Sequence, residues 1–591
     1  MRAEMSPLPG AGLAAAGGGR GAWLGALAVV AAAALVFLPA LGARDFWAPD
    51  EPRFAVIARE MLRSGDWIVP RMNGYPIALL PPLTYWLAAL PSVPAGDVTE
   101  TTGRLALVGS GALALLGVYA LGRRIGGTTG AGLASAAVLG TTAQFVHQTR
   151  FLQADIHLFA GTTWALALFY QGYLEPERRR VCYPLMGVAI AFGWLAKGPV
   201  AAVVPGLVVL VFLLARRDLW RGLLANAGFW AAVAACIALV APWYVAVCWR
   251  VNEPDFTKEL LLKHNFGMFF ETWSHLEPFY YYLVQLPAFL LPWTPLLPGA
   301  VAWLWRRAGT EEARRDRLFL VVWAASLLIF YSISEAKQAK YLLPLYPAPA
   351  IAVGLLWAEA GRALETLRRP RWLVHGPLLL ISGVFALAGV AGVLVGVVGV
   401  YPAAASHPWL ARAAVFGGIG FLVVGSIGAI AVRGGRTAGS FACVAAAVAV
   451  GAVVAQVVVL PGINERKSAR RLCAKMGLHA PPDEPIGIYG LGSRQHGDYI
   501  YYSGRRIVIF RDEDRLAPEP ERPEDRVERL EAYLRSDRPV YVLAPTKLFD
   551  AAIRTHPTTG PLVHELFRED KGSKSFVFFT NAKAQARVVR Q

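Results

Sequence analysis

The chain has 591 residues and a formal net charge of +17, and 55% of its residues are hydrophobic whereas only 17% are charged. Together with a mean hydropathy of +0.43, this composition excludes an ordinary soluble protein. The basic residues form short clusters between apolar runs, which indicates membrane orientation and contact with membrane lipid rather than nucleic-acid binding. The five cysteines are widely scattered and predict neither a disulfide framework nor a metal site.

The N-terminal segment, residues 1–21, is rich in Ala and Gly and is predicted to be a cytoplasmic tail. The uncharged run 22–41 follows it and is longer than the apolar region of a usual signal peptide. We therefore expect a retained membrane anchor, which opens a transmembrane domain predicted to span residues 22–462.

Two adjacent carboxylates, Asp50 and Glu51, follow the first apolar run and are flanked by Pro49 and Pro52. Apolar residues then recur at helical spacing, at Phe54, Ile57, Met61 and Leu62. This pattern predicts an amphipathic helix lying on the membrane surface, within an extracytoplasmic loop 43–102. Asp50 could simply cap this helix, or it could position or deprotonate an acceptor as a general base.

Further apolar runs predict a polytopic helical protein with about thirteen spans. With the N-terminus inside, every arginine cluster lies in the cytoplasm, whereas the loop 43–102, the loop 249–279 and the C-terminus lie on the other side. A break at Lys197-Gly198-Pro199 divides one long run into two. The runs cover residues 105–121, 131–147, 156–173, 181–215, 229–247, 280–305, 318–333, 341–357, 372–400, 411–432 and 440–460.

The composition becomes mixed and charged near the end of the transmembrane domain, which predicts a periplasmic domain over residues 463–591. Strands are predicted at 486–490, 506–510, 540–544 and 576–580, with a helix at 524–535. This order predicts a small α/β domain.

Several ionisable residues are predicted to reach the same extracytoplasmic surface as Asp50. Arg150 and Asp155 could be a snorkelling arginine and a helix cap, and Lys197 a charged helix end, but a cation at this surface could also bind a lipid phosphate. The other candidates are His264, Lys337, Lys340 and Tyr341. The spans carry few ionisable residues away from their ends, which favours an enzyme at the membrane face over a carrier.

Motifs spread over most of the chain resemble the bacterial polytopic glycosyltransferases of the C-type fold, which use polyprenyl-phosphate sugars. This family includes protein O-mannosyltransferases and the lipid A aminoarabinose transferases, to which the chain is most similar. The motifs are PDEPRFA from Pro49, MLRSGDWIVP from Met61, Asn73-Gly74, PPL with Tyr85-Trp86, Arg150 with Asp155, KGP from Lys197, Pro242-Trp243-Tyr244, His264-Asn265, Pro292-Trp293, and Ser334 to Pro344.

The resemblance implies that a sugar is transferred from undecaprenyl phosphate to a cell-envelope acceptor, with inversion at the anomeric carbon. Asp50 would be the central catalytic carboxylate and Asp155 the second, and Lys197, Lys337 and Tyr341 would bind the donor phosphate. Other candidates for substrate binding are Glu51, Arg53, Arg59, Tyr85, Arg150, His264 and Lys340. The acceptor would be lipid A or another envelope glycan. No cofactor is implied with certainty, but a divalent metal ion is a possible one.

The chain departs from the family at Leu79-Leu80, where these enzymes usually carry Glu-Lys before Pro-Pro-Leu. The resemblance implies that this lysine holds the lipid phosphate, so Arg53, Arg150 or Lys197 would have to replace it. Two alternatives stay open: an enzyme similar to the protein O-mannosyltransferases, and a non-catalytic protein that binds or flips lipid-linked sugars.

Overall fold

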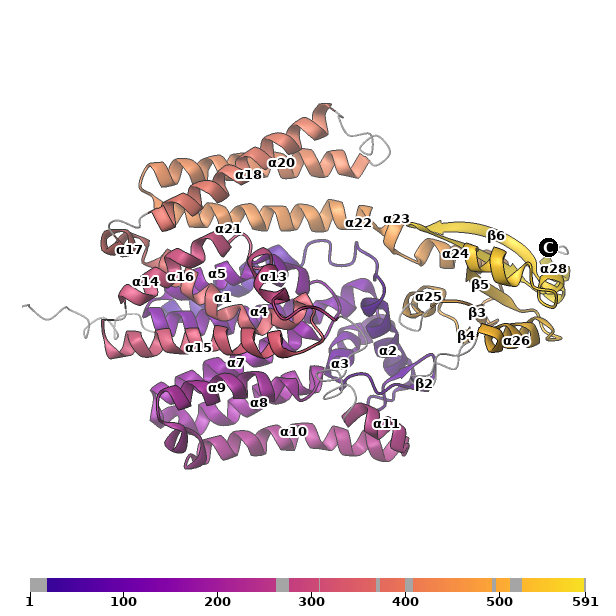
Figure 1. The fold of residues 1–591 in the computed structure, drawn as a ribbon, viewed down its shortest axis with the longest axis horizontal. Helices are drawn as coiled ribbons and strands as arrows, with labels where there is room; N and C mark the ends of the chain where they lie inside the picture. The colour runs from indigo at the N-terminus through magenta and orange to yellow at the C-terminus, as the bar shows by residue number, and fades with distance from the viewer. Residues whose placement is uncertain are drawn as a thin grey trace, which may run out of the picture. The chain divides into compact units, whose positions relative to one another are not determined.

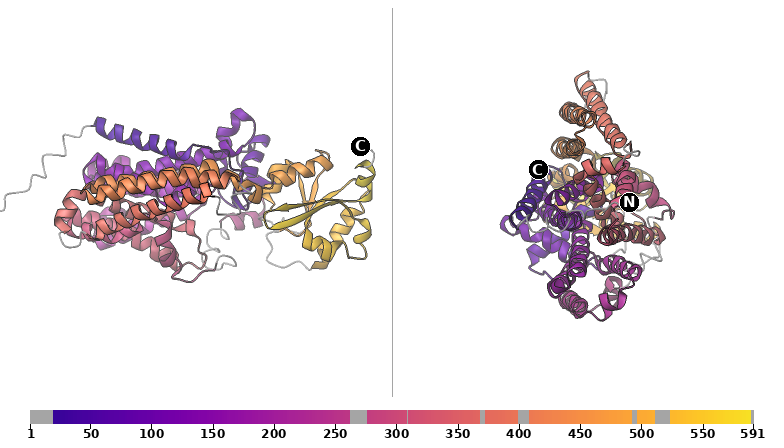
Figure 2. Two further views of the ribbon diagram at one scale, coloured as in Figure 1. Left: turned by 90° about the horizontal axis from the view of Figure 1, so that it is seen from above. Right: turned by 90° about the vertical axis from the view of Figure 1, so that its left-hand side faces the viewer.

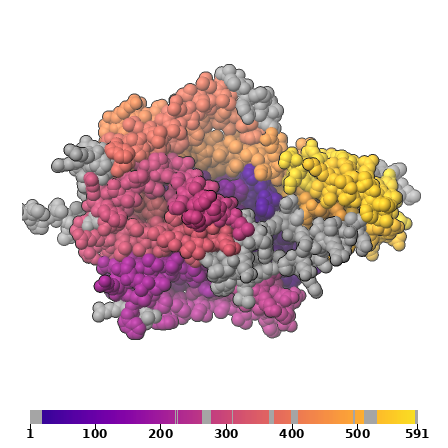
Figure 3. All heavy atoms as spheres, viewed as in Figure 1, coloured from indigo at the N-terminus to yellow at the C-terminus, as the bar shows by residue number. Residues whose placement is uncertain are grey.

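The computed structural model describes residues 19–261, 276–307, 309–367, 372–398, 408–491, 496–510 and 523–588 (Figure 1). The coloured atoms of Figure 3 show one face of these residues. The chain divides into two compact units, and each draws on segments that are far apart in the sequence. The first unit comprises Met1–Pro39, Leu79–Leu83 and Leu107–Ala455, and the second comprises Ala40–Ala78, Thr84–Ala106 and Gln456–Gln591.

The named elements in the described residues of the first unit are helices, joined by loops that include one isolated β-bridge between Leu276 and Ala336. Its longer helices are α1 (Gly19–Phe37), most of α4 (Glu100–Gly126), α5 (Thr129–Gly140), α7 (Asp155–Leu174), α8 (Arg179–Lys197), α9 (Val200–Ala215), α10 (Ala227–Val251), α14 (Leu297–Arg307), α15 (Glu311–Ile333), α16 (Pro347–Ala358), α18 (Trp372–Val398), α20 (Pro408–Arg433) and α21 (Thr437–Val454). Shorter helices are α6 (Ala143–Gln148), α11 (Pro254–Lys258), α13 (Tyr281–Phe289), α17 (Ala360–Leu367) and the 3-10 helix η6 (Ala339–Leu345).

Seven helices in the described part of the chain are long and apolar enough to cross a membrane, or up to nine if each of two bent pairs forms one span. The chain is therefore a multi-pass membrane protein, as predicted. The count of about thirteen is not confirmed, because α5 and α9 are apolar but shorter than these helices. The predicted break at Lys197 is confirmed: α8 ends there, Gly198 has a φ of 93°, and α9 begins at Val200.

Helices α18 and α20 approach each other closely along glycines and lie beside α21 (Figures 1 and 2). A Cβ at Gly418 of α20 would lie 2.7 Å from the backbone nitrogen of Val393 and 2.9 Å from the carbonyl oxygen of Gly389, both on α18. Because backbone atoms cannot turn aside as a side chain can, glycine is what permits this contact between helices.

Gly418→Ala is therefore expected to lower the midpoint of thermal denaturation in detergent, at a cost of about 1–3 kcal/mol for overpacking. Gly383→Ala on α18 is the matched control, because a Cβ there meets nothing within 4 Å. Its midpoint should be unchanged or higher, since alanine favours helix. Equal midpoints for the two variants would contradict a close α18–α20 contact.

The second unit combines the segment after the first span with the C-terminal part of the chain. Its first part holds α2 (Asp50–Ser64), the hairpin β1 (Arg71–Met72) and β2 (Tyr75–Pro76), most of α3 (Leu83–Ala89) and η1 (Leu90–Ala95). Its second part includes α22 (Leu460–Gly462), α23 (Asn464–Lys467), α24 (Arg470–His479), β3 (Ile486–Ile488), α25 (Gly497–Ser503), β4 (Ile507–Ile509), α26 (Pro523–Leu534), β5 (Tyr541–Pro545), β6 (His564–Lys571), β7 (Lys574–Thr580) and α28 (Ala582–Val588).

The C-terminal part is an α/β domain with a five-stranded sheet in the order β4-β3-β5-β7-β6 (Figure 2). Strands β4, β3 and β5 are parallel, whereas β7 is antiparallel to β5 and to β6. Its core contains Val542, Val577 and Phe579 of the sheet together with Leu530 and Leu534 of α26. The predicted α/β class, the four predicted strands and the helix are confirmed, and the domain boundaries 22–462 and 463–591 stay predictions.

Helix α2 is the predicted amphipathic helix, but its apolar face does not lie open to lipid. Phe54, Ile57 and Met61 are at most 4% exposed, so protein atoms cover this face. The expectation of a helix lying on the membrane surface is corrected in this respect. The periodicity identified an apolar face but could not distinguish a protein partner from a lipid one.

Candidate functional site

Asp50 is the first residue of α2, directly after Pro49. Its Oδ1 lies 2.8 Å from Nη2 of Arg53, one helical turn later, and the two side chains are 22% and 16% exposed. Pro49 occupies the N-cap position of α2, and Asp50 lies in the first turn, where a carboxylate interacts favourably with the helix dipole. A partly exposed carboxylate held by an arginine can orient a hydroxyl or phosphate of a substrate.

Glu51 turns the other way and is fully buried between two arginines of the same unit. Its Oε1 lies 2.7 Å from Nη2 of Arg44 and 3.0 Å from Nε of Arg104, and Trp47 donates its backbone N–H to Oε2 at 3.1 Å. Burial alone would raise the pKa of Glu51, but the charges of Arg104 and Arg44 outweigh it and hold the pKa at about 2.

Arg53 and Tyr85 carry buried polar atoms for which the described residues offer no hydrogen-bond partner, Nε of Arg53 and Oη of Tyr85. The Tyr85 ring packs 5.6 Å from that of Phe54, which connects α3 to α2. Arg59 is engaged differently, because its Nε donates to Asp97 at 2.6 Å. Of these candidates, Arg53 and Tyr85 thus have donors available for a further ligand.

In the first unit the structure brings together Asp155, Lys197 and Tyr341, which are far apart in the sequence. Asp155 begins α7 and Lys197 ends α8, and the two side chains form an ion pair in which Asp155 is 6% exposed. Nζ of Lys197 lies 4.7 Å from the centre of the Tyr341 ring. The arrangement presents one cation between a carboxylate and an aromatic face.

Two of the remaining candidates, Arg150 and Lys337, donate to backbone carbonyl oxygens. Arg150 is buried and donates to the carbonyl oxygen of Pro39 at 2.8 Å, and also to that of Phe37. Lys337 is buried and donates to the carbonyl oxygen of Glu277 at 2.9 Å. Lys340 lies half-buried in η6, and His264 lies outside the described residues.

An apolar cavity of about 730 Å³ adjoins Lys337. Leu283 of α13 and Leu328 and Ile333 of α15 contribute to its lining, and Glu277, Glu335 and Lys337 supply its charged groups. A cavity that is lined mostly by hydrocarbon suits the apolar part of a lipid. Across the described ranges, no group of three or more His, Cys, Asp or Glu side chains is placed to hold a metal ion.

Residues 22–259 match the family described as dolichyl-phosphate-mannose-protein mannosyltransferase. The chain is 30% identical over 410 residues to undecaprenyl phosphate-alpha-4-amino-4-deoxy-L-arabinose arabinosyl transferase 2 of Sodalis glossinidius, a match that covers 68% of this chain and 70% of that protein. The chain belongs to this arabinosyl transferase family. Transferase 1 of the same organism is 34% identical over 388 residues, covering 65% of this chain and 66% of the relative.

The fold agrees with this membership. The crystal structure of ArnT from Cupriavidus metallidurans bound to undecaprenyl phosphate superposes with a TM-score of 0.73 and 23% identity, over 96% of this chain and 99% of that one. The predicted family and the C-type fold are therefore confirmed.

Leu79 and Leu80, which precede Pro81-Pro82-Leu83, are two half-buried apolar residues. Sequence reasoning missed Arg44 and Arg104 as partners of Glu51. Neither had a signal, because a basic residue next to a membrane span is ordinary: Arg44 follows the run 22–41, and Arg104 directly precedes the run 105–121.

Proposed function

We propose that this chain transfers a sugar from undecaprenyl phosphate to lipid A or another envelope glycan, at the periplasmic face of the inner membrane. The observation that carries the proposal is the membership of the arabinosyl transferase family together with the carboxylate Asp50 paired with Arg53, whose Nε has no hydrogen-bond partner among the described residues. 4-Amino-4-deoxy-L-arabinose is the sugar named in the relatives and the first to test.

Asp50 acts on the acceptor in this proposal. It orients the attacking oxygen and, where that oxygen is a hydroxyl, removes its proton. The oxygen attacks the anomeric carbon, the bond from that carbon to the phosphate oxygen breaks with its electron pair, and undecaprenyl phosphate leaves. Arg53 holds Asp50 in place through their ion pair, and Glu51 anchors the helix start through Arg44 and Arg104 rather than touching substrate.

Lys197 and Tyr341 serve the donor in this proposal. The ammonium group binds the phosphate, whose negative charge grows as the sugar leaves, and Asp155 fixes the ammonium while Tyr341 flanks it. Lys197 thereby takes the phosphate-binding role that the resemblance assigns to a lysine at the position where this chain has Leu79-Leu80. The apolar cavity beside Lys337 is a candidate for part of the prenyl chain.

The proposed topology places the N-terminus in the cytoplasm and the C-terminal domain in the periplasm. It rests on the arginine clusters, which lie on one side when the spans are threaded in this way. Labelling of single cysteines introduced at exposed positions, such as Leu478 in α24, with a membrane-impermeant maleimide tests it. Labelling of Leu478→Cys from the cytoplasmic side only would contradict it.

The activity itself is tested with purified protein, a donor labelled in the sugar, and lipid A. Release of undecaprenyl phosphate together with label in lipid A supports the proposal. Label in protein would favour an enzyme like the protein O-mannosyltransferases, which the match over residues 22–259 makes the second candidate. Donor binding without release of undecaprenyl phosphate would favour a binding or flipping protein.

Lys197→Gln is expected to raise KM for the donor about 10- to 100-fold, because a charge-assisted hydrogen bond to phosphate contributes about 1.5–3 kcal/mol. The rate of release at several donor concentrations measures the change. Lys574→Gln, at an exposed position of β7, removes the same charge and should leave KM unaltered. An unchanged KM in the Lys197 variant would remove it from the donor site.

A further inference from the structure

We propose that the C-terminal domain holds the acidic loop, defined here as residues 43–53 and including the first turn of α2, in its working position, and that Arg470 is the positioning residue. The inference rests on the proposed role of Asp50, which lies in this loop. In this inference the α/β domain contributes to the transfer reaction by positioning the acidic loop. The acidic loop and the α/β domain belong to the same compact unit, so their contacts can be followed residue by residue.

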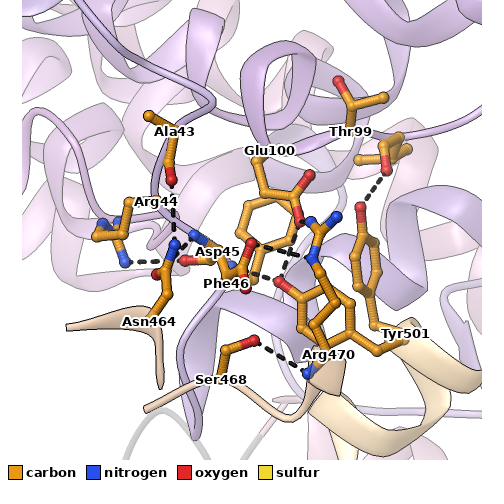
Figure 4. A network of polar contacts seen from close by, with 12 residues as sticks. Ala43, Arg44, Asp45, Phe46, Thr99, Glu100, Asn464, Ser468, Arg470 and Tyr501 are labelled. Atoms are coloured by element: carbon orange, nitrogen blue, oxygen red, sulfur yellow. Dashed lines mark hydrogen bonds and ion pairs between the residues drawn. The ribbon is translucent and has the colours of Figure 1, made fainter. Parts of the chain in front are cut away.

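Arg470, near the start of α24, joins two carboxylates from different segments (Figure 4). Its Nε lies 3.0 Å from Oδ1 of Asp45 in the acidic loop, and its Nη2 pairs with Glu100 at the start of α4. Tyr502 of α25 adds to the network, since its Oη donates to Glu100 at 3.0 Å and accepts the backbone N–H of Phe46 at 2.7 Å. Arg470 thus links the start of α24 both to the acidic loop and to the start of α4.

Asn464 of α23 binds the same loop through both ends of its amide (Figure 4). Its Oδ1 accepts the backbone N–H of Asp45 and the indole N–H of Trp47, each at 3.0 Å, and its Nδ2 donates to the carbonyl oxygen of Ala43 at 3.1 Å. Two of the three partners are main-chain atoms, so these bonds fix the path of the backbone that leads into Asp50.

Helix α25 contacts the loop and α2 from another side. The Tyr501 ring packs edge-on against Phe46 with centres 5.1 Å apart, and its carbonyl oxygen accepts from Arg59 of α2 at 2.7 Å. A Cβ at Gly497 would lie 2.9 Å from the backbone nitrogen of Arg53. The domain therefore touches the chain on both sides of Asp50, at Asp45 to Trp47 before it and at Arg53 after it.

These contacts distinguish positioning from general stability. The side chain of Arg470 is 54% exposed, so its ion pairs contribute little to unfolding free energy, as is usual for surface pairs. Yet the loop segment they hold is three to five residues from a carboxylate whose orientation sets the rate. A small displacement there costs turnover far more than stability.

The test compares Arg470→Ala, Arg470→Lys and Arg471→Ala in the full-length protein. Arg471 is the matched control, because it removes the same charge at the next position, where the partner is Glu569 of β6 and not the loop. Amide hydrogen exchange over residues 43–53 reports the loop, and undecaprenyl phosphate release reports turnover. We expect Arg470→Ala to speed exchange in this segment and to lower kcat about tenfold or more at unchanged donor KM, with partial recovery in Arg470→Lys.

Gly497→Ala provides a second approach from α25, since its added Cβ must displace the backbone of Arg53. It should also lower kcat, whereas Gly477→Ala in α24, whose Cβ would meet only the end of Arg505 at 3.9 Å, should not.

Unaltered exchange in Arg470→Ala would overturn the inference, and so would faster exchange with full turnover, which would leave the role of Asp50 intact. If the wild-type protein turned over no donor, the proposed function would fail instead. Exchange over residues 43–53 would then still decide whether the domain holds the loop.

Discussion

Asp50→Asn is expected to lower kcat by about 10²- to 10³-fold while the protein still folds and binds donor. The substitution keeps the size of the side chain and removes its charge, so the orientation of an acceptor oxygen is weakened and its proton can no longer be taken. The ion pair with Arg53, 2.8 Å long, is also lost, but it is partly exposed and contributes little to folding.

Release of undecaprenyl phosphate at saturating donor measures this loss, and Asp483→Asn is the control because that carboxylate is exposed in the C-terminal domain. The control should retain full turnover. Full turnover in the Asp50 variant would remove Asp50 from the reaction and leave the acidic loop as a structural feature.

The pH dependence of the Asp50 variant distinguishes the two possible acceptors. A phosphate monoester loses its second proton near pH 6, so above about pH 7 it needs orientation but no base. With such an acceptor, the loss in kcat should shrink as pH rises from about 5.5 to 7.5 and then stay constant. With a hydroxyl acceptor, the loss should persist across this range, because the hydroxyl keeps its proton.

Much of the fold was predictable because it follows from local patterns. Long uncharged runs identified the helices that can cross a membrane, and Gly198-Pro199 identified the break between α8 and α9. Apolar strands such as β5 were found in the C-terminal domain, whereas β6 was missed because most of its residues are charged or polar. An edge strand with one exposed face carries little of the apolar signal on which strand prediction depends.

The candidate site was predictable as a set of residues but not as a set of contacts. Sequence reasoning placed Asp155 and Lys197 on one surface, and the structure joins them in an ion pair. It could not find the partnership of Arg470 with Asp45 and Glu100, because the Arg470–Glu100 pair spans 370 positions. No local pattern specifies which of 58 basic side chains meets a given carboxylate.

Sequence reasoning placed both adjacent carboxylates at the site, Asp50 as the catalytic group and Glu51 as a candidate for substrate binding. Asp50 and Glu51 point in different directions from the start of α2, so that Asp50 stays partly exposed and Glu51 is enclosed by two arginines. Side chains one residue apart on a helix do not share a face. The separation of a candidate catalytic group from a structural one therefore follows from helix geometry once the start of α2 is known.

Glu51→Gln is expected to destabilise the protein by about 3–5 kcal/mol, the usual cost of removing one member of a buried ion pair. The amide would take the charge of Glu51 away from Arg44 and Arg104, whose side chains are at most 3% exposed. The midpoint of thermal denaturation in detergent at pH 7 measures the loss of stability. Turnover should fall only in proportion to the loss of folded protein, so that turnover per folded molecule stays unchanged.

Glu60→Gln is the matched control on the same helix, because the carboxylate of Glu60 accepts from the backbone N–H groups of Asn73 and Gly74 rather than from a cation. An amide oxygen can still accept one of these bonds, so the cost should be at most about 1–2 kcal/mol.

The two variants also differ in the pH dependence of their stability. The pKa of Glu51 is lowered on folding from its ordinary value of 4.5 to about 2, so its contribution is fully present above about pH 4.5 and lost as pH falls toward 2. The stability difference between wild type and Glu51→Gln should shrink over that window. For Glu60, burial raises the pKa, so protonation favours the folded state and no such loss on acidification is expected. A difference between wild type and Glu51→Gln that stayed constant down to pH 2 would contradict the ion-paired state of Glu51.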